Sequence, residues 1–436
     1  MPITELRIEG LRTIEKVRLP LDGLTVLIGD NGTGKSSILE ACEILRRATD
    51  RNFMKALYGI HGGLTALLRQ GKSRIVLGVT IQPTQGEYGF NSSWPESVEY
   101  DLVLEDDQVF ATIEEVIRLR QRAEDSSVQM PRGASKAAKT PTARLPKRPE
   151  VALKRRAAHV DLRGSGLKTT IDDEVPFIAT KDDEIDWGGT GGDGEAQIVA
   201  HYLREALVHL PFETIPAWAA RALDRKSALR TSSLLTPADH LDKLGLNLAS
   251  SYHALKNNFG RAHWDKTLEY IRLGLGERIE DIVTWVDPGG GNIGISVKLA
   301  GLDRPIPSAQ LSDGMLSYLA FVALFRLHTT KPSLVAFDEP DLHLHPQLLM
   351  RVLDMFESMA REHPVILATH SDRLLDGLSD PAKSVVLCEL DERGATRLVR
   401  PDAEALAKWL ERYRGLGDIR GAGHAASVLT KVEPAG

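Results

Sequence analysis

The sequence predicts an α/β protein in which buried strands alternate with helices and end on polar residues. The first observation is Leu24–Ile28, an apolar and partly β-branched run followed by a glycine-rich turn and a helical pattern up to Arg47. The second and third are residues 333–337 and 365–368, two apolar runs that stop at acidic residues and close to a histidine. Such residues lie at the carboxyl edge of a sheet, where α/β proteins bind ligands.

The glycine-rich turn matches the pattern G-x-x-x-x-G-K-[ST] of a phosphate-binding loop. Its glycines allow backbone N–H groups to point at an anion, and the helix N-terminus adds a partial positive charge. We expect Lys35 to reach the β- and γ-phosphates of ATP and the Ser36 hydroxyl to ligate Mg²⁺. A chance Gly-rich turn does not explain the strand and the helix on its two sides. The predicted ATP-binding residues are Gly29, Asp30, Asn31, Gly32, Thr33, Gly34, Lys35, Ser36 and Ser37.

Length and composition limit the class of protein. At 436 residues the chain exceeds one ordinary hydrophobic core, so two or three lobes are expected. The net charge of −6 does not indicate a nucleic-acid binder, so any basic surface must be local. Cys42 and Cys388 are expected to be buried thiols of a cytosolic protein. The sequence has no charged-then-apolar leader and no apolar window of about 18 residues, so we expect a cytoplasmic protein without a membrane span.

The N-terminal part is predicted to join a nucleotide-binding core to an antiparallel β subdomain. Alternating apolar and polar residues over 3–28 indicate three short strands. Further strands are expected at residues 74–81, 97–104 and 109–113. We assign residues 1–75 to the core and residues 76–123 to the β subdomain.

The middle of the chain changes composition twice. Residues 124–170 place Lys and Arg among Pro, Ala, Ser and Thr, with almost no large apolar residue, so we expect them to be flexible. This basic segment suits either a salt-sensitive contact with a DNA backbone or a solvated linker, and both readings stay open. An acidic and glycine-rich stretch follows, and residues 124–194 are treated as one flexible insert. Residues 195–292 repeat apolar side chains at helical spacing between prolines, which predicts an inserted helical lobe.

Residues 293–436 return to the core and supply the second half of the site. Asp338 and Glu339 end an apolar strand, and we expect Asp338 to hold Mg²⁺ and Glu339 to polarise the water that attacks the γ-phosphate. His370 follows the next apolar strand and can donate a hydrogen bond to that phosphate. Residues 310–315 open an apolar helix whose N-terminus is a second phosphate-binding candidate, although Ser-Asp-Gly is also an ordinary N-cap.

Two histidines raise one competing interpretation. His343 and His345 stand two residues apart beside acidic residues, an arrangement that can indicate a metal site. No second group of histidines or cysteines with metal-site spacing supports that interpretation, so we assign no metal to them.

The glycine-rich loop, the helix start at 310–315 and the two apolar strands near Asp338 and His370 follow one another in the chain. In this order they resemble the ATP-binding-cassette (ABC) ATPases, in particular the branch that contains SMC proteins, RecF and the OLD-like ATPases. Residues 29–36 match the Walker A loop, and residues 334–339 match Walker B with its catalytic glutamate. Asp341 matches the D-loop and His370 the switch histidine. The signature motif is matched by Leu311, Ser312, Asp313 and Gly314. The resemblance covers roughly residues 1–80 and 300–400, and the middle matches only loosely.

The resemblance implies a P-loop NTPase of the ABC-ATPase head type, with an antiparallel β subdomain and an inserted helical lobe. It implies a homodimer that forms around two ATP molecules and Mg²⁺, with the signature of one subunit on the γ-phosphate held by Lys35 of the other. Catalytic roles then fall to Glu339, His370 and Lys35, and Ser36 and Asp338 hold the metal. One glutamine, either Gln70 or Gln82, would sense Mg²⁺ and the γ-phosphate.

Three features of the sequence differ from particular members of this superfamily and limit which of them the chain resembles. The chain has no long heptad-bearing segment, so we do not expect a coiled-coil arm. The interval between Lys35 and Ser312 is far longer than in a transporter cassette. Only 66 residues follow His370, too few for the nuclease of OLD proteins, so any nuclease is expected to be a separate chain.

The expected function is therefore ATP hydrolysis by a dimer that engages DNA, in DNA repair or in anti-phage defence. The alternative is an ATP-gated scaffold or sensor that controls a separate effector, for example a nuclease, with little direct DNA binding.

Overall fold

The structure, a computed structural model, places the apolar runs at 24–28, 333–337 and 365–368 in one central sheet, whereas the two strands before residue 24, which were assigned to the core, belong to an antiparallel sheet. It describes residues 2–83, 95–106, 111–120, 150–156, 159–162, 168–170, 175–179, 194–212, 214, 228–289, 291–328, 331–411 and 415–422. The central sheet has six strands in the order β10-β15-β16-β3-β17-β18, of which the first five are parallel and β18 is antiparallel to β17. The strands are β3 (Leu24–Ile28), β10 (Ala206–His209), β15 (Leu334–Asp338), β16 (Val365–Ala368), β17 (Val385–Leu390) and β18 (Thr396–Val399).

The central sheet separates two hydrophobic cores, because its buried strands alternate their side chains between two faces. Leu27, Ala336 and Ile366 belong to the first core, while Val335 and Leu367 belong to the second. β15 and β16 are therefore apolar on both faces up to the point where they end, and the polar residues Asp338 and His370 lie at or just after those ends. This is why the sequence shows continuous apolar runs that stop at Asp338 and shortly before His370.

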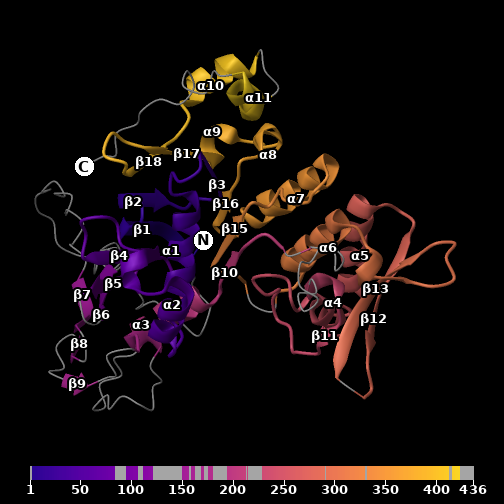
Figure 1. Ribbon diagram of the computed structural model, residues 1–436, viewed down its shortest axis with the longest axis horizontal. Helices are drawn as coiled ribbons and strands as arrows, with labels where there is room; N and C mark the ends of the chain where they lie inside the picture. Colours follow the sequence, from indigo (N-terminus) through magenta and orange to yellow (C-terminus); the bar gives the residue numbers. More distant parts are fainter. Residues whose placement is uncertain are drawn as a thin grey trace, which may run out of the picture.

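An eight-stranded antiparallel sheet lies on the same side of the molecule as α1 (Lys35–Arg47) (Figure 1). Its order is β2-β1-β4-β5-β6-β7-β8-β9. The strands are β1 (Ile3–Leu11), β2 (Ile14–Pro20), β4 (Arg74–Ile81), β5 (Ser97–Asp106), β6 (Ala111–Arg120), β7 (Glu150–Arg156), β8 (His159–Leu162) and β9 (Lys168–Thr170). The predicted strands at 3–28, 74–81 and 97–104 are confirmed, and the strand expected at 109–113 begins at Ala111.

The expectation of a flexible insert over 124–194 is wrong for its described strands. β7 pairs with the edge of β6, and β8 and β9 extend the sheet by further antiparallel pairing. A strand can join a sheet edge through main-chain hydrogen bonds, so low apolar content does not rule it out. For the rest of 124–194, apart from residues 175–179 and 194, the expectation of flexibility falls outside the described residues.

The expected helical lobe over 195–292 is only partly helical. It contains α3 (Gly194–Arg204), α4 (Leu248–Asn257) and α5 (Arg261–Leu275), but β10 crosses into the central sheet. A small sheet is formed by β11 (Ser233–Leu234), β12 (Ile279–Val286), β13 (Asn292–Leu299) and β14 (Ile306–Pro307). Short apolar runs such as Ala206–His209 do not distinguish a buried strand from a helix by periodicity, so the tertiary pairing decided the outcome.

The remaining helices lie around the sheets. α6 and α5 stand in the part of the molecule that carries β12 and β13, and α10 and α11 lie at the opposite end of the view from β9 (Figure 1). These helices are α2 (Phe53–His61), α6 (Asp313–Arg326), α7 (Pro346–Met359), α8 (Asp372–Asp376), α9 (Pro381–Ser384), α10 (Ala403–Leu410) and α11 (Leu416–Gly421). Within the described ranges, no helix combines the length and the apolar character needed to cross a bilayer.

Candidate ATP site

The phosphate loop (residues 29–37) connects the fully buried β3 to α1, as the sequence predicts. Gly29, Gly32 and Gly34 have φ values of 144°, 79° and 102°, conformations that L side chains rarely adopt. At Gly29 a Cβ atom would also lie 2.2 Å from the carbonyl oxygen of Cys388, so the close approach of β17 excludes any side chain. Glycine is thus required here both by dihedral angle and by space.

The Lys35 ammonium lies inside this loop. Its Nζ donates hydrogen bonds to the carbonyl oxygens of Gly29 at 2.8 Å and Asp30 at 2.9 Å. Burial lowers the pKa of Lys35, and the nearby carboxylates of Glu339 and Asp338 act in the opposite direction. The loop is held in shape by the Thr33 hydroxyl, which donates to the Asp30 carbonyl at 2.8 Å.

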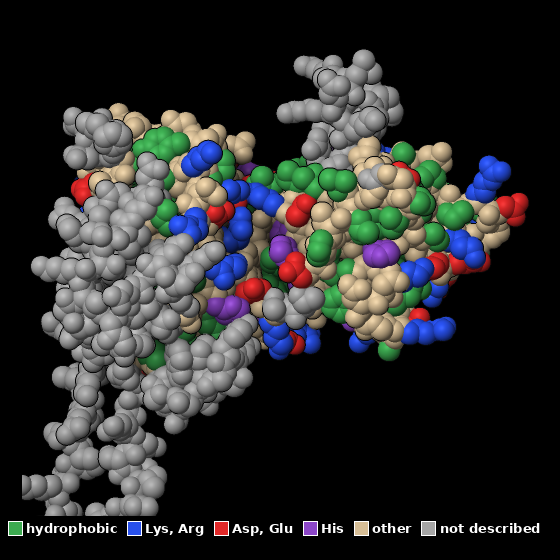
Figure 2. All heavy atoms as spheres, turned by 90° about the horizontal axis from the view of Figure 1, so that it is seen from below, with side chains coloured by type: hydrophobic (Ala, Val, Ile, Leu, Met, Phe, Trp, Pro, Cys, Tyr) green, Lys and Arg blue, Asp and Glu red, His purple; other side chains and the backbone are tan. Residues whose placement is uncertain are grey.

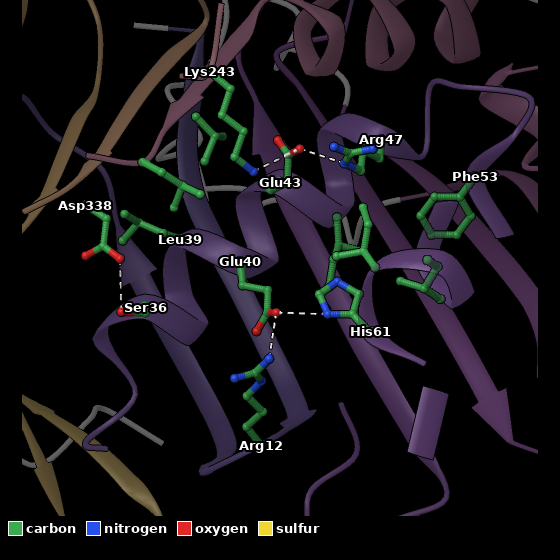
Figure 3. Close-up of a pocket in the computed structure, with 15 residues that line it drawn as sticks. Arg12, Ser36, Leu39, Glu40, Glu43, Arg47, Phe53, His61, Lys243 and Asp338 are labelled. Carbon is green, nitrogen blue, oxygen red and sulfur yellow. Dashed lines mark hydrogen bonds and ion pairs between the residues drawn. The ribbon is translucent and has the colours of Figure 1, made fainter. Parts of the chain in front are cut away.

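Ser36 and Asp338 bring the two halves of the predicted site together. The Ser36 hydroxyl donates a hydrogen bond of 3.2 Å to the Asp338 carboxylate at the end of β15 (Figure 3). Burial raises the pKa of Asp338, while the Ser36 hydrogen bond and the Lys35 charge lower it. A hydroxyl and a carboxylate at this spacing are the hard oxygen donors that Mg²⁺ prefers, so the residues present fit that ion.

Glu339 occupies a strained position beside this pair. Its φ of 49° lies in the left-handed region, and its N–H donates to the Ala368 carbonyl at 2.8 Å. A non-glycine residue in this conformation costs on the order of 1–3 kcal/mol and is found most often at functional sites. Burial, followed by the charges of Asp341 and Asp338, raises the pKa of the Glu339 carboxyl, which makes its carboxylate a stronger base.

His370 lies opposite Glu339, with 3.7 Å between its Nε2 and the Glu339 Oε1. Burial and the charge of Lys35 lower the pKa of His370, which favours the neutral imidazole. The structure thus gathers Lys35, Ser36, Asp338, Glu339 and His370 at one edge of the central sheet. In the view from below, basic, acidic and histidine side chains are visible together near the middle of the molecule (Figure 2).

Asp341 is hydrogen-bonded to the segment that follows β16 and carries His370. The Thr369 hydroxyl donates to its carboxylate at 2.6 Å, and the N–H of Ser371 donates to the same hydroxyl at 3.0 Å. Sequence reasoning missed Thr369, which is fully buried. The only signal available was its position beside His370.

The signature loop (Leu311–Gly314) caps α6. The Ser312 side chain accepts a hydrogen bond of 3.3 Å from the N–H of Met315 and is otherwise exposed. Gly314 lies against the turn after Asp341, since a Cβ there would be 3.2 Å from the His343 carbonyl oxygen. Arg230, which sequence reasoning did not single out, donates to the Leu311 carbonyl and pairs with Asp313, and the Leu311 N–H donates to the Ser308 carbonyl.

The phosphate loop is supported from the C-terminal hairpin, another feature that the sequence did not reveal. The Thr396 hydroxyl on β18 donates to the Thr33 carbonyl at 2.9 Å and is hydrogen-bonded to the Thr13 hydroxyl, also at 2.9 Å. Arg69 donates to the Thr13 carbonyl at 2.8 Å and to the Gly394 carbonyl at 3.0 Å. The contacts of Thr396 and the contact between Arg69 and Gly394 join segments hundreds of residues apart in the chain.

A cavity of about 280 Å³ begins at Ser36 and Asp338 and runs along α1 (Figure 3). Its wall carries two charge clusters. Arg12 donates to Glu40 at 2.9 Å, with His61 3.4 Å from the same carboxylate oxygen. Glu43, buried among Arg46, Arg47 and Lys243, has a pKa lowered to about 2 because these cations outweigh the effect of burial.

The other predicted residues have different surroundings. Neither Gln70 nor Gln82 lines this cavity, so the choice between them as the sensing glutamine stays a prediction. His345 caps α7 by accepting a bond from Gln347, and within the described residues no three His, Cys, Asp or Glu side chains form a metal cluster. Cys42 and Cys388 are buried free thiols, as expected.

Comparison with known proteins gives two family matches. Residues 1–121 match a family described as an AAA ATPase domain. Residues 222–376 match a family of AAA domains described as a proposed AbiEii toxin of Type IV TA systems. A curated relative, protein ea59 of Escherichia phage lambda, is 40% identical over 78 residues, a stretch that spans 17% of this chain and 14% of ea59.

Solved structures of similar fold are SMC head domains. The SMC head bound to the C-terminal winged-helix domain of ScpA has a TM-score of 0.53 at 14% identity, covering 94% of this chain and 100% of that one. The SMC head with an extended coiled coil, bound to the C-terminal domain of ScpA from Pyrococcus furiosus, has a TM-score of 0.52 at 14% identity, covering 94% and 99%. The chain therefore has the fold of an SMC head domain, and two of its segments match AAA ATPase families, in agreement with the arrangement of the site.

Proposed function

We propose that the chain hydrolyses ATP with Mg²⁺ at the edge formed by β3, β15 and β16. The observation that carries this proposal is the 3.2 Å hydrogen bond between Ser36 and Asp338, with Glu339 next in the chain. Two oxygen donors suit Mg²⁺, which commonly takes its remaining ligands from nucleotide phosphates and water. When bound, that ion would neutralise charge on the β- and γ-phosphates.

In the proposed mechanism, the phosphate loop binds through its backbone N–H groups and the N-terminus of α1. Lys35 exchanges its bonds with the Gly29 and Asp30 carbonyls for bonds with phosphate oxygens. Glu339 accepts a proton from the attacking water, and its raised pKa matches that task. His370, 3.7 Å from Glu339, is placed to donate a hydrogen bond near the same phosphate.

We further propose that ATP joins two copies of the chain. Ser312 is exposed at the N-terminus of α6, a helix of 14 residues, and this terminus favours an anion. The signature loop forms hydrogen bonds with Arg230, Ser308, Met315 and Leu316, and none of these residues belongs to the phosphate loop. A second copy would bring its own γ-phosphate to this loop, so that ATP closes the dimer and hydrolysis opens it.

The proposed role of the ATPase is to engage DNA in repair or in anti-phage defence. The match to a family described as a proposed toxin of Type IV TA systems supports the defence setting. The stretch aligned with ea59 covers 14% of that protein, so this likeness carries no role over to the chain. The second candidate is an ATP-gated scaffold that controls a separate effector, and the SMC heads solved with ScpA domains favour it.

The test is the ATPase rate with no DNA, with duplex DNA and with single-stranded DNA, at low and at moderate salt. Lys35→Ala protein gives the background, because it lacks the phosphate-binding ammonium. Stimulation by DNA that fades with salt supports a DNA-engaged ATPase, since phosphate contacts weaken as salt rises. Turnover that no DNA changes favours the scaffold, and wild-type turnover at the Lys35→Ala background contradicts hydrolysis altogether.

A further inference from the structure

Arg230 is a buried cation whose hydrogen bonds and ion pair fix the position of the signature loop. It ends the 3₁₀ helix Ala228–Arg230 and is 8% exposed. Its guanidinium donates to the carbonyl oxygens of Leu311 at 2.6 Å, Ala309 at 3.2 Å and Thr214 at 2.9 Å.

The same guanidinium forms an ion pair with the carboxylate of Asp313. A residue shortly before the signature loop also donates a hydrogen bond back to Arg230. The Ser308 hydroxyl donates to the Arg230 carbonyl at 3.2 Å, so the two short 3₁₀ helices Ala228–Arg230 and Ser308–Gln310 are bonded to each other. Burying a guanidinium is costly unless its donors find partners. Here Nη1 and Nη2 bond to the signature loop or to Ala309 just before it, and Nε bonds to the Thr214 carbonyl.

We propose that Arg230 is the positioning residue of the signature loop, holding it ready for the γ-phosphate bound by a second copy of the chain. This inference rests on the proposed ATP-dependent dimer. Arg230 fixes the backbone at Leu311, one residue before Ser312, and thereby sets the direction in which α6 starts. Because Ser312 itself is exposed, its hydroxyl stays available while its backbone is held.

The ion pair with Asp313 explains why an arginine is suitable. Asp313 is the first residue of α6 and is acidic, so its carboxylate would repel a phosphate that approaches the same helix terminus. Arg230 neutralises that charge and holds the carboxylate beside itself. Without Arg230, the signature loop would lose its bonds at Leu311 and Ala309 and would present an unpaired acid to the incoming phosphate.

The experiment measures ATP-dependent dimerisation in a Glu339→Gln background, where hydrolysis is blocked. Arg230→Ala is expected to leave binding of an ATP analogue to the single chain unchanged and to weaken dimerisation about tenfold or more, the size of a lost charge-assisted hydrogen bond. Arg230→Lys should be intermediate, because an ammonium cannot bond in the planar fork geometry. The matched control is Arg272→Ala, which removes bonds to the Ile279 and Glu280 carbonyls in the same lobe and should leave dimerisation intact.

A second substitution, added to Arg230→Ala, distinguishes a positioning role of Arg230 from a general loss of folding. Adding Asp313→Asn to Arg230→Ala should restore part of the dimerisation, since the unpaired charge is removed. Unchanged dimerisation in Arg230→Ala, or a loss that Arg272→Ala reproduces, would overturn the role of Arg230. If the Glu339→Gln parent itself stays monomeric with ATP and Mg²⁺, the proposed dimer is wrong and this inference falls with it.

Discussion

The Ser36 hydroxyl donates to the Asp338 carboxylate although 302 positions separate the two residues in the chain. β3 and β15 both border β16 and run parallel to it, so their carboxyl ends meet at one edge of the sheet. At this edge the phosphate loop follows β3, and the acidic pair Asp338 and Glu339 stands at the end of β15. The central sheet therefore assembles the site, and the inserted lobe between the two halves does not need to take part in that pairing.

Replacing Glu339 with Gln should lower the ATPase rate by on the order of 10²-fold or more, because the amide cannot accept the proton of water. Binding of ATP should remain, since the phosphate loop is unchanged. Steady-state turnover and equilibrium binding of a fluorescent ATP analogue measure the two effects. Turnover at the wild-type rate would show that Glu339 is not the base.

Gly29→Ala should be far more destabilising than Gly32→Ala. The new Cβ at position 29 would meet the Cys388 carbonyl at 2.2 Å, whereas a Cβ at position 32 meets nothing within 4 Å. Gly32→Ala should cost only the strain of a left-handed conformation, about 1–2 kcal/mol, and Gly29→Ala clearly more. Denaturant unfolding of both variants compares them, and equal losses would contradict the close approach of β17.

Thr396→Val should weaken ATP binding although Thr396 lies outside the phosphate loop. The substitution removes the hydrogen bonds to Thr33 and Thr13 while keeping the shape of the side chain. One lost hydrogen bond corresponds to about fivefold in affinity. Titration with an ATP analogue checks this, with Thr284→Val in the small sheet as the control; identical affinities in both variants would show that the hairpin does not support the loop.

Stability should fall as the pH drops below about 6.5, because two buried histidines stay neutral in the fold. Burial lowers the pKa of His209 to about 3 and that of His328 to about 4, from the ordinary value of 6.5. Below pH 6.5 the unfolded chain binds protons that the folded chain does not, so each histidine contributes a loss of about 1.4 kcal/mol per pH unit until its folded pKa is reached.

The corresponding variant is His209→Phe, chosen because His209 is stacked on Phe337 and its Nδ1 has no hydrogen-bond partner among the described residues. It should reduce the slope of unfolding free energy against pH between 6 and 4, whatever it does to stability at pH 7.5. A slope equal to that of the wild type would show that His209 does not remain neutral when buried.

The sequence predicted the parts of the site that lie in short continuous stretches. Gly29 to Ser37 and Asp338-Glu339 could be recognised because strand, turn and chemistry follow each other within a few residues. Thr396 and Arg230 could not, because each acts through contacts with residues far away in the chain. A lone threonine on a strand or an arginine in a loop has no local pattern that marks it.

The same difference between local patterns and contacts far apart in the chain explains which predictions of the fold were wrong. β7 to β9 were missed because their pairing with β6 depends on a sheet edge that local composition does not reveal. β10 was expected to be helical because a run of four mostly apolar residues is too short to distinguish a strand from the helical pattern around it. Its parallel pairing with β15 makes it a strand. Long periodic elements such as α1, by contrast, were predicted closely.

The central claim is that one ATP site is built from the phosphate loop of one chain and the signature loop of another. The most direct measurement mixes Lys35→Ala protein, which keeps Ser312, with Ser312→Arg protein, which keeps Lys35, and follows ATP hydrolysis. Each variant alone should be inactive, and the mixture should hydrolyse ATP because a mixed dimer contains one complete site. A mixture that stays inactive, or Ser312→Arg protein that is active alone, would contradict a site shared between two chains.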